Sequence, residues 1–481
     1  MKSDLLSFAA LAPAYPELLL AVGAIVLLIV GVIWSRERSN GIAVAAILLL
    51  MAVIAVAIWQ PAQGVLFNGG FINDTFARYM KILLLGCSAF TLVLSTSTAK
   101  SFGLDKFEYA ILVLLATLGM MVMTSANDLM SLYVGLELQS LALYVVTALR
   151  RDDPRAAEAG LKYFVLGALS SGMLLYGASL IYGFTGMTQL DQIVTVIAGS
   201  GRSIGLIFGV VFLIAGVAFK LAAVPFHMWI PDVYEGAPTP VTAFFTAAPK
   251  VAAMALMVRV VTVPFGSITH DWQQIIVFLS IASMVLAAFA AIGQTNLKRF
   301  MAYSAIGHVG FALVGLSAGT AVGVEGVAVY LPIYVTMTIG FFAAMLGMRT
   351  SEGYVETIPQ MAGLAQKRPF LAAIIAIIMF SFIGLPPLAG FFAKWQVFLA
   401  AIDAHLFVLA VIGVLASAVS AFYYLRIVKV MYFDEPTSEF MPVPAELTAV
   451  MAVAGFLIVT YFVTIGSPLY AAAHAAAGSL F

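Results

Sequence analysis

The fold is decided most clearly by residues 370–402, FLAAIIAIIMFSFIGLPPLAGFFAKWQVFLAAI. This run is apolar except for one charged residue, Lys394, and the sequence GLPP interrupts it at residues 384–387. A helix needs about 20 apolar residues to cross the hydrocarbon of a bilayer. Proline removes a backbone N–H and clashes with the preceding turn. The run therefore predicts one broken membrane-spanning helix with a lysine inside the membrane.

The composition of the whole chain agrees with a membrane protein. Of the 481 residues, 63% are hydrophobic and 10% are charged, whereas a soluble domain has about 25% charged residues. The mean hydropathy is +1.07. Basic and acidic residues both number 23, and no basic run of the kind that binds nucleic acid is present. The single cysteine, Cys87, excludes a disulfide within the chain and a cysteine-ligated iron–sulfur cluster.

Hydrophobic runs predict an all-α integral membrane protein with about fourteen transmembrane helices, if residues 370–402 are one crossing. The expected spans are 15–34, 41–60, 76–96, 108–125, 128–149, 157–183, 203–223, 240–263, 272–294, 299–318, 323–347, 370–402, 404–431 and 445–470.

The loops between these spans predict the orientation, because cytoplasmic loops carry an excess of Lys and Arg. If the N-terminus lies outside, the inner loops hold fourteen basic residues, Arg36 and Arg38 among them. The outer side then holds four, which are Lys2, Arg78, Arg202 and Arg259. We therefore expect both termini on the outer, periplasmic side.

A second interruption lies at Pro225 in the seventh span, five spans before the interruption in the twelfth. Five is odd, so two inverted five-helix repeats are expected, over helices 4–8 and 9–13, with helices 7 and 12 broken. The expected division is a three-helix segment (1–107), two repeats that each form a half-channel (108–265 and 266–431), and a C-terminal helix 14 (432–481). Interrupted helices at matching positions of two halves indicate a transport pathway. Two unrelated kinks remain the alternative.

Ionisable residues inside predicted spans are costly, at roughly 2.5–3.5 kcal/mol each on insertion scales, and each needs a reason. Glu137 lies near the middle of the fifth span, and Lys162 opens the sixth. They are natural partners, either as a structural ion pair or as the entry of a proton relay. Lys162 is also close enough to the inner surface to extend its amine toward water.

Three lysines cannot easily reach an interface. Lys220 precedes the first interruption, Lys250 lies near the middle of the eighth span, and Lys394 follows the second interruption. Removal from water disfavours the charged form of a lysine, so such an amine can take up and release a proton, which arginine cannot do. These lysines are predicted proton carriers.

Histidines and further charged residues also lie in or near the predicted spans. His227 and His308 lie in apolar or interrupted regions, and a neutral imidazole can pass a proton between its nitrogens. Packing is the alternative role for both. The remaining residues are expected near the membrane surfaces: His270, His405 and His474 as solvated groups, Lys81 as extending to the outer surface, Asp128 as a helix cap, and Asp232 and Glu235 as part of an inner loop.

Enzymatic motifs are missing from the sequence. It contains no Walker A motif, no dinucleotide-binding fingerprint and no cluster of metal-binding residues. Redox chemistry or ATP hydrolysis by the chain alone is therefore not expected. The energy for transport must come from an ion gradient or from a partner protein.

A family resemblance rests on residues 225–242, PFHMWIPDVYEGAPTPVT, supported by 162–177, KYFVLGALSSGMLLYG, and 384–394, GLPPLAGFFAK. These stretches resemble the antiporter-like membrane subunits of NADH–quinone oxidoreductase (respiratory complex I) and of Mrp-type cation/proton antiporters. The resemblance covers nearly the whole chain. Lys394 argues against the sister type M, which has a glutamate there, and the end at Phe481 argues against type L, which has a long C-terminal helix.

The resemblance implies a proton-translocating subunit of the membrane arm, which takes part in NADH:quinone reduction without redox chemistry of its own. Glu137 and Lys162 would form the charged pair of the first half-channel and modulate Lys220. Lys250 would lie on the central axis, and Lys394 would deliver the proton outward.

Cofactors and partners follow from the same resemblance. No cofactor or metal is expected in this chain, whereas FMN, iron–sulfur clusters and quinone are expected in partner subunits. The expected partners are antiporter-like subunit M, small helical subunits and membrane lipids, in a bacterial plasma membrane. The alternatives are a subunit of an Mrp-type Na⁺/H⁺ antiporter, a structural subunit whose charges only hold helices together, and a transporter of a small solute.

Overall fold

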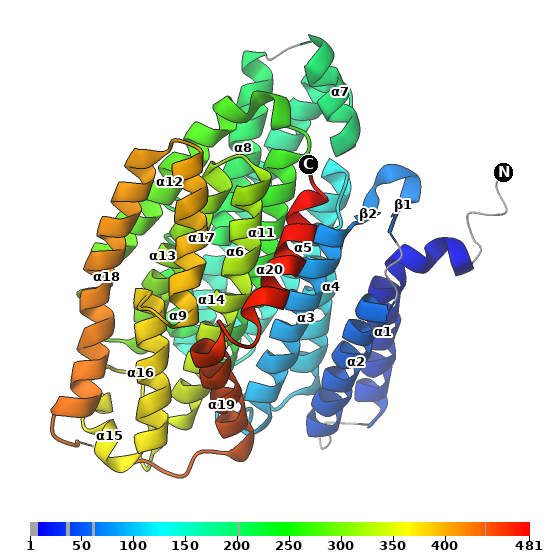
Figure 1. The fold of residues 1–481 in the computed structure, drawn as a ribbon. Helices are drawn as coiled ribbons and strands as arrows, with labels where there is room; N and C mark the ends of the chain where they lie inside the picture. The colour runs from blue at the N-terminus through cyan, green and yellow to red at the C-terminus, as the bar shows by residue number, and fades with distance from the viewer. Residues whose placement is uncertain (1–7, 35–38, 60–62, 201–202, 438) are drawn as a thin grey trace. The chain divides into compact units, whose positions relative to one another are not determined.

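The computed structural model of the protein describes residues 8–34, 39–59, 63–200, 203–437 and 439–481. Lys2, Arg36, Arg38 and Arg202, which entered the orientation argument, lie outside the described residues. The chain is mostly α-helical (Figure 1). It divides into two compact units. Unit 1 comprises Met1–Leu221, Ala247–Trp272 and Ala475–Phe481, and unit 2 comprises Ala222–Thr246 and Gln273–His474.

Unit 1 is a set of packed helices with a short hairpin of strands β1 (Gly64–Leu66) and β2 (Phe71–Asn73), in which Val65 pairs with Ile72. Helices α1 and α2, dark blue in Figure 1, lie side by side. The helices are η2 (Phe8–Ala14), α1 (Tyr15–Trp34), α2 (Ser39–Trp59), η4 (Phe67–Gly69), α3 (Thr75–Thr96), α4 (Phe107–Thr124), α5 (Leu129–Thr147), α6 (Pro154–Thr185), α7 (Leu190–Ser200), α8 (Ile204–Leu221), α11 (Ala248–Thr262) and η5 (Gly266–Ile268).

Unit 2 is also helical, with one small hairpin of β3 (Arg349–Thr350) and β4 (Gly353–Tyr354). Its helices α16 and α18, yellow and orange in Figure 1, pack against each other. The helices are α9 (Ile230–Gly236), α10 (Thr239–Thr246), most of α12 (Thr269–Ala290), α13 (Leu297–Ser317), α14 (Ala321–Gly347), η6 (Pro359–Met361), α15 (Leu364–Lys367), α16 (Pro369–Ile383), α17 (Ala389–Asp403), α18 (Phe407–Phe433), α19 (Ala445–Thr460) and most of α20 (Gly466–Gly478).

Polar side chains mark where the long helices begin. Asp74 accepts a hydrogen bond from the Ala77 N–H at the start of α3, and Asp128 accepts one from the Met130 N–H at the start of α5. Such caps satisfy the N–H groups that have no partner within the helix. The expectation that Asp128 caps the fifth span is confirmed.

Helix packing in unit 1 depends on small residues. A Cβ atom on Gly177 of α6 would lie 2.5 Å from the Leu213 backbone nitrogen of α8, and one on Gly119 of α4 would lie 2.4 Å from the Gln139 nitrogen of α5. Small residues let membrane helices approach closely. These contacts set the positions of α5, α6 and α8, the helices that carry Glu137, Lys162 and Lys220.

Twelve stretches of the described chain are long and apolar enough to cross a membrane. They correspond to twelve of the fourteen expected spans. The other two are represented by the interrupted pair α16 and α17 and by α19, whose 15 to 16 residues are shorter. The membrane-protein class is confirmed, whereas the count of fourteen crossings and the inverted repeats stay predictions.

The two predicted interruptions are present. Helix α8 ends at Leu221 and is followed by Ala222 with a φ of +60°, while α16 ends at Ile383 and is followed by Gly384 with a φ of +90°. A left-handed residue directly after a helix is a common way to end it. A third break, at Ala247 between α10 and α11, was not predicted, although Pro249 in the first turn of α11 was a signal for it.

Several expectations about charged residues are wrong. Asp232 and Glu235 lie in helix α9, where both accept hydrogen bonds from Arg299, and not in a loop. Lys81 is 1% exposed and forms an ion pair with Glu17 in place of extending to the surface. Arg259, which is expected on the outer side, is buried within α11.

Candidate functional site

Lys220 lies in the last turn of α8 and is buried against α5. Its amine donates to Ser140 Oγ at 2.8 Å and to Tyr144 OH at 3.3 Å. Glu137 lies one turn before Ser140 on the same helix. Glu137 Oε1 is buried and accepts no hydrogen bond from the described protein groups. The buried Lys220 amine is therefore held by two hydroxyls of α5, the helix that also carries Glu137.

Lys162 lies on α6, close to its start. Its amine forms an ion pair with Glu158 at 2.8 Å, one turn earlier, and its side chain is 41% exposed. Exposure of this kind fits the expectation that the amine extends toward water. Pairing of Lys162 with Glu137 stays a prediction.

Lys250 occupies the first turn of α11, directly after the break at Ala247. The side chain is 2% exposed, and the amine donates to the Leu221 carbonyl at 2.5 Å. Leu221 is the last residue of α8, so its carbonyl has no partner within that helix. The break after α8 therefore supplies an acceptor for a buried lysine of another helix.

Lys394 lies on α17, after the second break, and is also buried. Its amine donates to the carbonyls of Phe382 and Ile383, at 3.0 and 2.9 Å, and to Ser417 Oγ of α18 at 2.7 Å. The amine also lies 4.5 Å from the centre of the Phe311 ring. The last carbonyls of α16 carry the partial negative charge of a helix C-terminus. They can stabilise an ammonium group without holding a permanent negative charge.

His308 lies on α13 in the same unit, surrounded by aromatic rings. Its Nδ1 is 2.6 Å from Tyr330 OH, and its Nε2 is 3.3 Å from Tyr424 OH. Its ring centre lies 4.9 Å from that of Phe382, whose carbonyl accepts from Lys394. The imidazole thus has a hydroxyl on each nitrogen, as a proton relay needs.

His227 lies in the segment between α8 and α9 and is half-buried. Its Nδ1 is buried and has no hydrogen-bond partner among the described protein groups. His405 is exposed, as expected, after the end of α17. His270 is exposed too, in the first turn of α12.

Comparisons with known proteins bear on what these sites are for. Residues 126–420 match the model of the family described as NADH:quinone oxidoreductase/Mrp antiporter, transmembrane. The chain is 57% identical to NADH-quinone oxidoreductase subunit N of Parvibaculum lavamentivorans, and the match covers 97% of each chain. It is 56% identical to subunit N 1 of Rhizobium meliloti, over 98% of each chain.

This chain belongs to the NADH-quinone oxidoreductase subunit N family. A chain of respiratory complex I from Thermus thermophilus has the same fold, with a TM-score of 0.82, 32% identity, and coverage of 95% of this chain and 99% of that one. A chain of the Mrp complex from Dietzia sp. has a TM-score of 0.86 at 21% identity, which shows the fold alone. Membership of the subunit N family leaves the Mrp-type antiporters as a related family.

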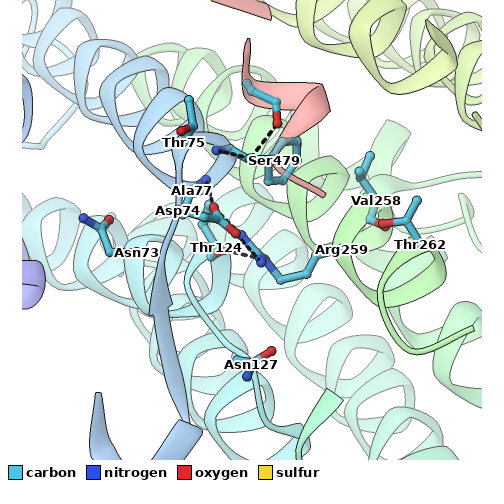
Figure 2. Close-up of polar contacts among 12 residues, drawn as sticks. Asn73, Asp74, Thr75, Ala77, Thr124, Asn127, Val258, Arg259, Thr262 and Ser479 are labelled. Carbon is cyan, nitrogen blue, oxygen red and sulfur yellow. Dashed lines mark hydrogen bonds and ion pairs between the residues drawn. The ribbon is translucent and has the colours of Figure 1, made fainter. Parts of the chain in front are cut away.

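In this member of the subunit N family, three ion pairs could not be predicted from local sequence, and two of them are buried. Figure 2 shows the first, in which Arg259 of α11 points at Asp74 at the start of α3. Two guanidinium nitrogens lie 2.8 and 2.9 Å from the two carboxylate oxygens, and Arg259 Nε donates to the Thr124 carbonyl at 3.2 Å. Asp74 and Arg259 are 185 residues apart in the sequence, so no local pattern could have paired them.

The second and third pairs lie one in each unit. In unit 1, Lys81 of α3 is 2.6 Å from Glu17 of α1. In unit 2, His474 Nδ1 of α20 is 2.6 Å from Glu325 Oε2 of α14. His474 is exposed, as expected, with 73% of its side chain accessible, and the pairing with Glu325 is an addition to that expectation.

The described residues contain no group of three or more His, Cys, Asp or Glu side chains that could hold a metal ion.

Proposed function

We propose that the protein translocates protons across the membrane, as a membrane-arm subunit of NADH-quinone oxidoreductase, through Glu137, Lys162, Lys220, His227, Lys250, His308 and Lys394. The observation that carries the proposal is a division among the buried cations within the expected spans. Lys81 and Arg259 contact carboxylates at 2.6 to 2.9 Å. Lys220, Lys250 and Lys394 donate to hydroxyls and to carbonyls at helix ends.

This division separates structural charges from mobile ones. A buried carboxylate holds the proton on its partner cation, and removing either partner leaves an uncompensated charge that costs about 3–5 kcal/mol. Neutral oxygens stabilise an ammonium group and also tolerate the neutral amine, which can accept a hydrogen bond from a hydroxyl. Lys220, Lys250 and Lys394 can therefore change protonation state without leaving a buried ion unpaired.

The proposed sequence of events begins in partner subunits. Their redox chemistry shifts a charge at one end of the polar axis, which separates or joins Glu137 and Lys162. The change in field alters the proton affinity of Lys220, whose amine donates to Ser140 and Tyr144 of α5, the helix that carries Glu137. The proton then moves through water and Lys250 toward Lys394, with His227 and His308 as further relays, and leaves on the outer side.

Replacing Lys220 or Lys394 by Met tests the proposal. Methionine has a similar length and no proton to give, so each variant should assemble and oxidise NADH while pumping fewer protons per electron. The measurement is proton uptake by inverted membrane vesicles, divided by NADH oxidised. A full proton yield in both variants, at normal assembly, would refute the proposal.

The assignment to a redox-driven complex has its own test, because the related Mrp-type antiporters have no redox partner. Mild extraction and purification should bring down flavin and iron–sulfur subunits together with this chain. The proposed partners are an antiporter-like subunit of type M and small helical subunits. We further propose a bacterial plasma membrane with both termini outside, and the four-part division at residues 107, 265 and 431.

A further inference from the structure

Glu325 is a buried carboxylate that the proposed proton path does not yet use. It lies in the second turn of α14 and is 5% exposed, within a helix whose other residues are apolar or uncharged. A charged group in this position is expensive unless it has partners and a role. The partners are on α20, where His474 Nδ1 lies 2.6 Å from Glu325 Oε2 and the Tyr470 hydroxyl is also hydrogen-bonded to the carboxylate.

The position of Glu325 relative to Lys394 follows from helix packing in unit 2. A Cβ atom on Gly326, the next residue, would lie 3.4 Å from the backbone of Gln396 on α17. Gln396 is two residues after Lys394, which is about 3 Å further along the helix. Glu325 thus lies beside α17, slightly beyond Lys394 in the direction of the α17 C-terminus.

The partner of Glu325, His474, lies at the protein surface. His474 has 73% of its side chain exposed, against 7% for Glu325. A buried carboxylate on a helix that packs against the helix of Lys394, paired with an exposed imidazole, can connect the interior to the surface. In the orientation proposed above, the C-terminal end of α17 faces the outer side.

We propose that Glu325 and His474 form the proton-release site, which takes the proton from Lys394 and passes it to the outer side; this rests on the proposed function. The ammonium group of Lys394 gives a proton, through a water relay, to the Glu325 carboxylate, which leaves a neutral amine and a neutral acid. The acid gives that proton to Nδ1 of His474, which becomes an imidazolium and releases the proton on Nε2 to water. Rotation of the ring then returns the unprotonated nitrogen to Glu325.

The alternative is a purely structural pair that ties α20 to α14. Glutamine at position 325 separates the two roles, because its amide keeps a hydrogen bond to His474 but cannot carry a proton. Glu325→Gln should lower the proton yield per electron in vesicles that contain the whole complex, by as much as Lys394→Met does. Glu325→Asp should keep most of the yield, and His474→Gln, at an exposed position, should lower it without affecting assembly.

Glu17→Gln is the matched control, since Glu17 is also a buried helical carboxylate, 6% exposed and paired with one basic side chain. In the assembled complex, Glu17→Gln should leave the number of protons pumped per electron unchanged. If Lys394→Met lowers the ratio while Glu325→Gln and His474→Gln behave like Glu17→Gln, the release site is wrong and the proposed function survives. If Lys394→Met itself leaves the ratio unchanged, the proposed function fails and the release site with it.

Discussion

The Lys220 site in unit 1 and the Lys394 site in unit 2 both hold a buried amine, but with different hydrogen-bond acceptors. Lys220 donates to two side-chain hydroxyls of α5, the helix that also carries Glu137. Lys394 donates to two backbone carbonyls at the end of α16 and to one hydroxyl. The first amine is therefore held by side chains on the helix of Glu137, whereas the second is held by fixed backbone dipoles. In the proposed path, this difference suits a responsive site at the start and a steady one near the end.

The largest expected effect comes from the contact between Gly390 of α17 and Ser381 of α16, beside the second break. A Cβ atom on Gly390 would lie 1.8 Å from the Ser381 carbonyl oxygen, so the backbone must move. Gly390→Ala should destabilise unit 2 by about 1–3 kcal/mol or more, as overpacking does, and should displace the carbonyls that hold Lys394. The measurement is the amount of assembled complex on native gels.

Gly172→Ala on α6 in unit 1 is the control for this change. No other group lies within 4 Å of the position that its Cβ would occupy, and alanine favours a helix by about 1 kcal/mol over glycine. Equal losses of assembly in both variants would mean that the close contact between Gly390 and Ser381 does not cause the loss.

An intermediate effect is expected from the two serines, and it should differ between the sites. Ser140 gives Lys220 its shorter hydrogen bond, 2.8 Å against 3.3 Å from Tyr144. Lys394 keeps its hydrogen bonds to two carbonyls when the Ser417 hydroxyl is removed. A hydrogen bond to a charged group contributes roughly 1.5–3 kcal/mol. Ser140→Ala should therefore lower the proton yield more than Ser417→Ala does. The reverse order would contradict the contrast between the two sites.

The smallest effect concerns the residues that end the two broken helices. Gly384 has a φ of +90°, and a Cβ there would lie 3.1 Å from Lys394 Cδ, whereas Ala222 already holds a φ of +60° with a Cβ. Left-handed backbone costs a residue with a side chain on the order of 1 kcal/mol or more. Gly384→Ala should lower the melting temperature of the purified complex by a few degrees, and Ala222→Gly should leave it unchanged or raise it slightly.

Local sequence predicted the parts of the site that local chemistry dictates. Proline near residues 225 and 386 predicted the breaks, and charge within apolar runs predicted that Lys220 and Lys394 are buried. The partners of these lysines could not be predicted, because Ser140 and Ser417 are hydroxyls among many and lie on other helices. Arg259 was misplaced for a similar reason: its carboxylate partner is distant in sequence, so its position near the end of a span looked like a surface position.

The most direct test of the central claim is the proton yield per electron after Lys394→Arg. Arginine keeps the positive charge and the hydrogen-bond donors but stays protonated, so it can fill a structural role and cannot carry a proton. Lys81→Arg is the control, because Lys81 contacts a carboxylate at 2.6 Å and has a structural role here. The account predicts a normal yield for Lys81→Arg and a lowered one for Lys394→Arg, with both complexes assembled. A normal yield from the Lys394→Arg complex would show that the charge, and not the exchange of a proton, is what this position needs.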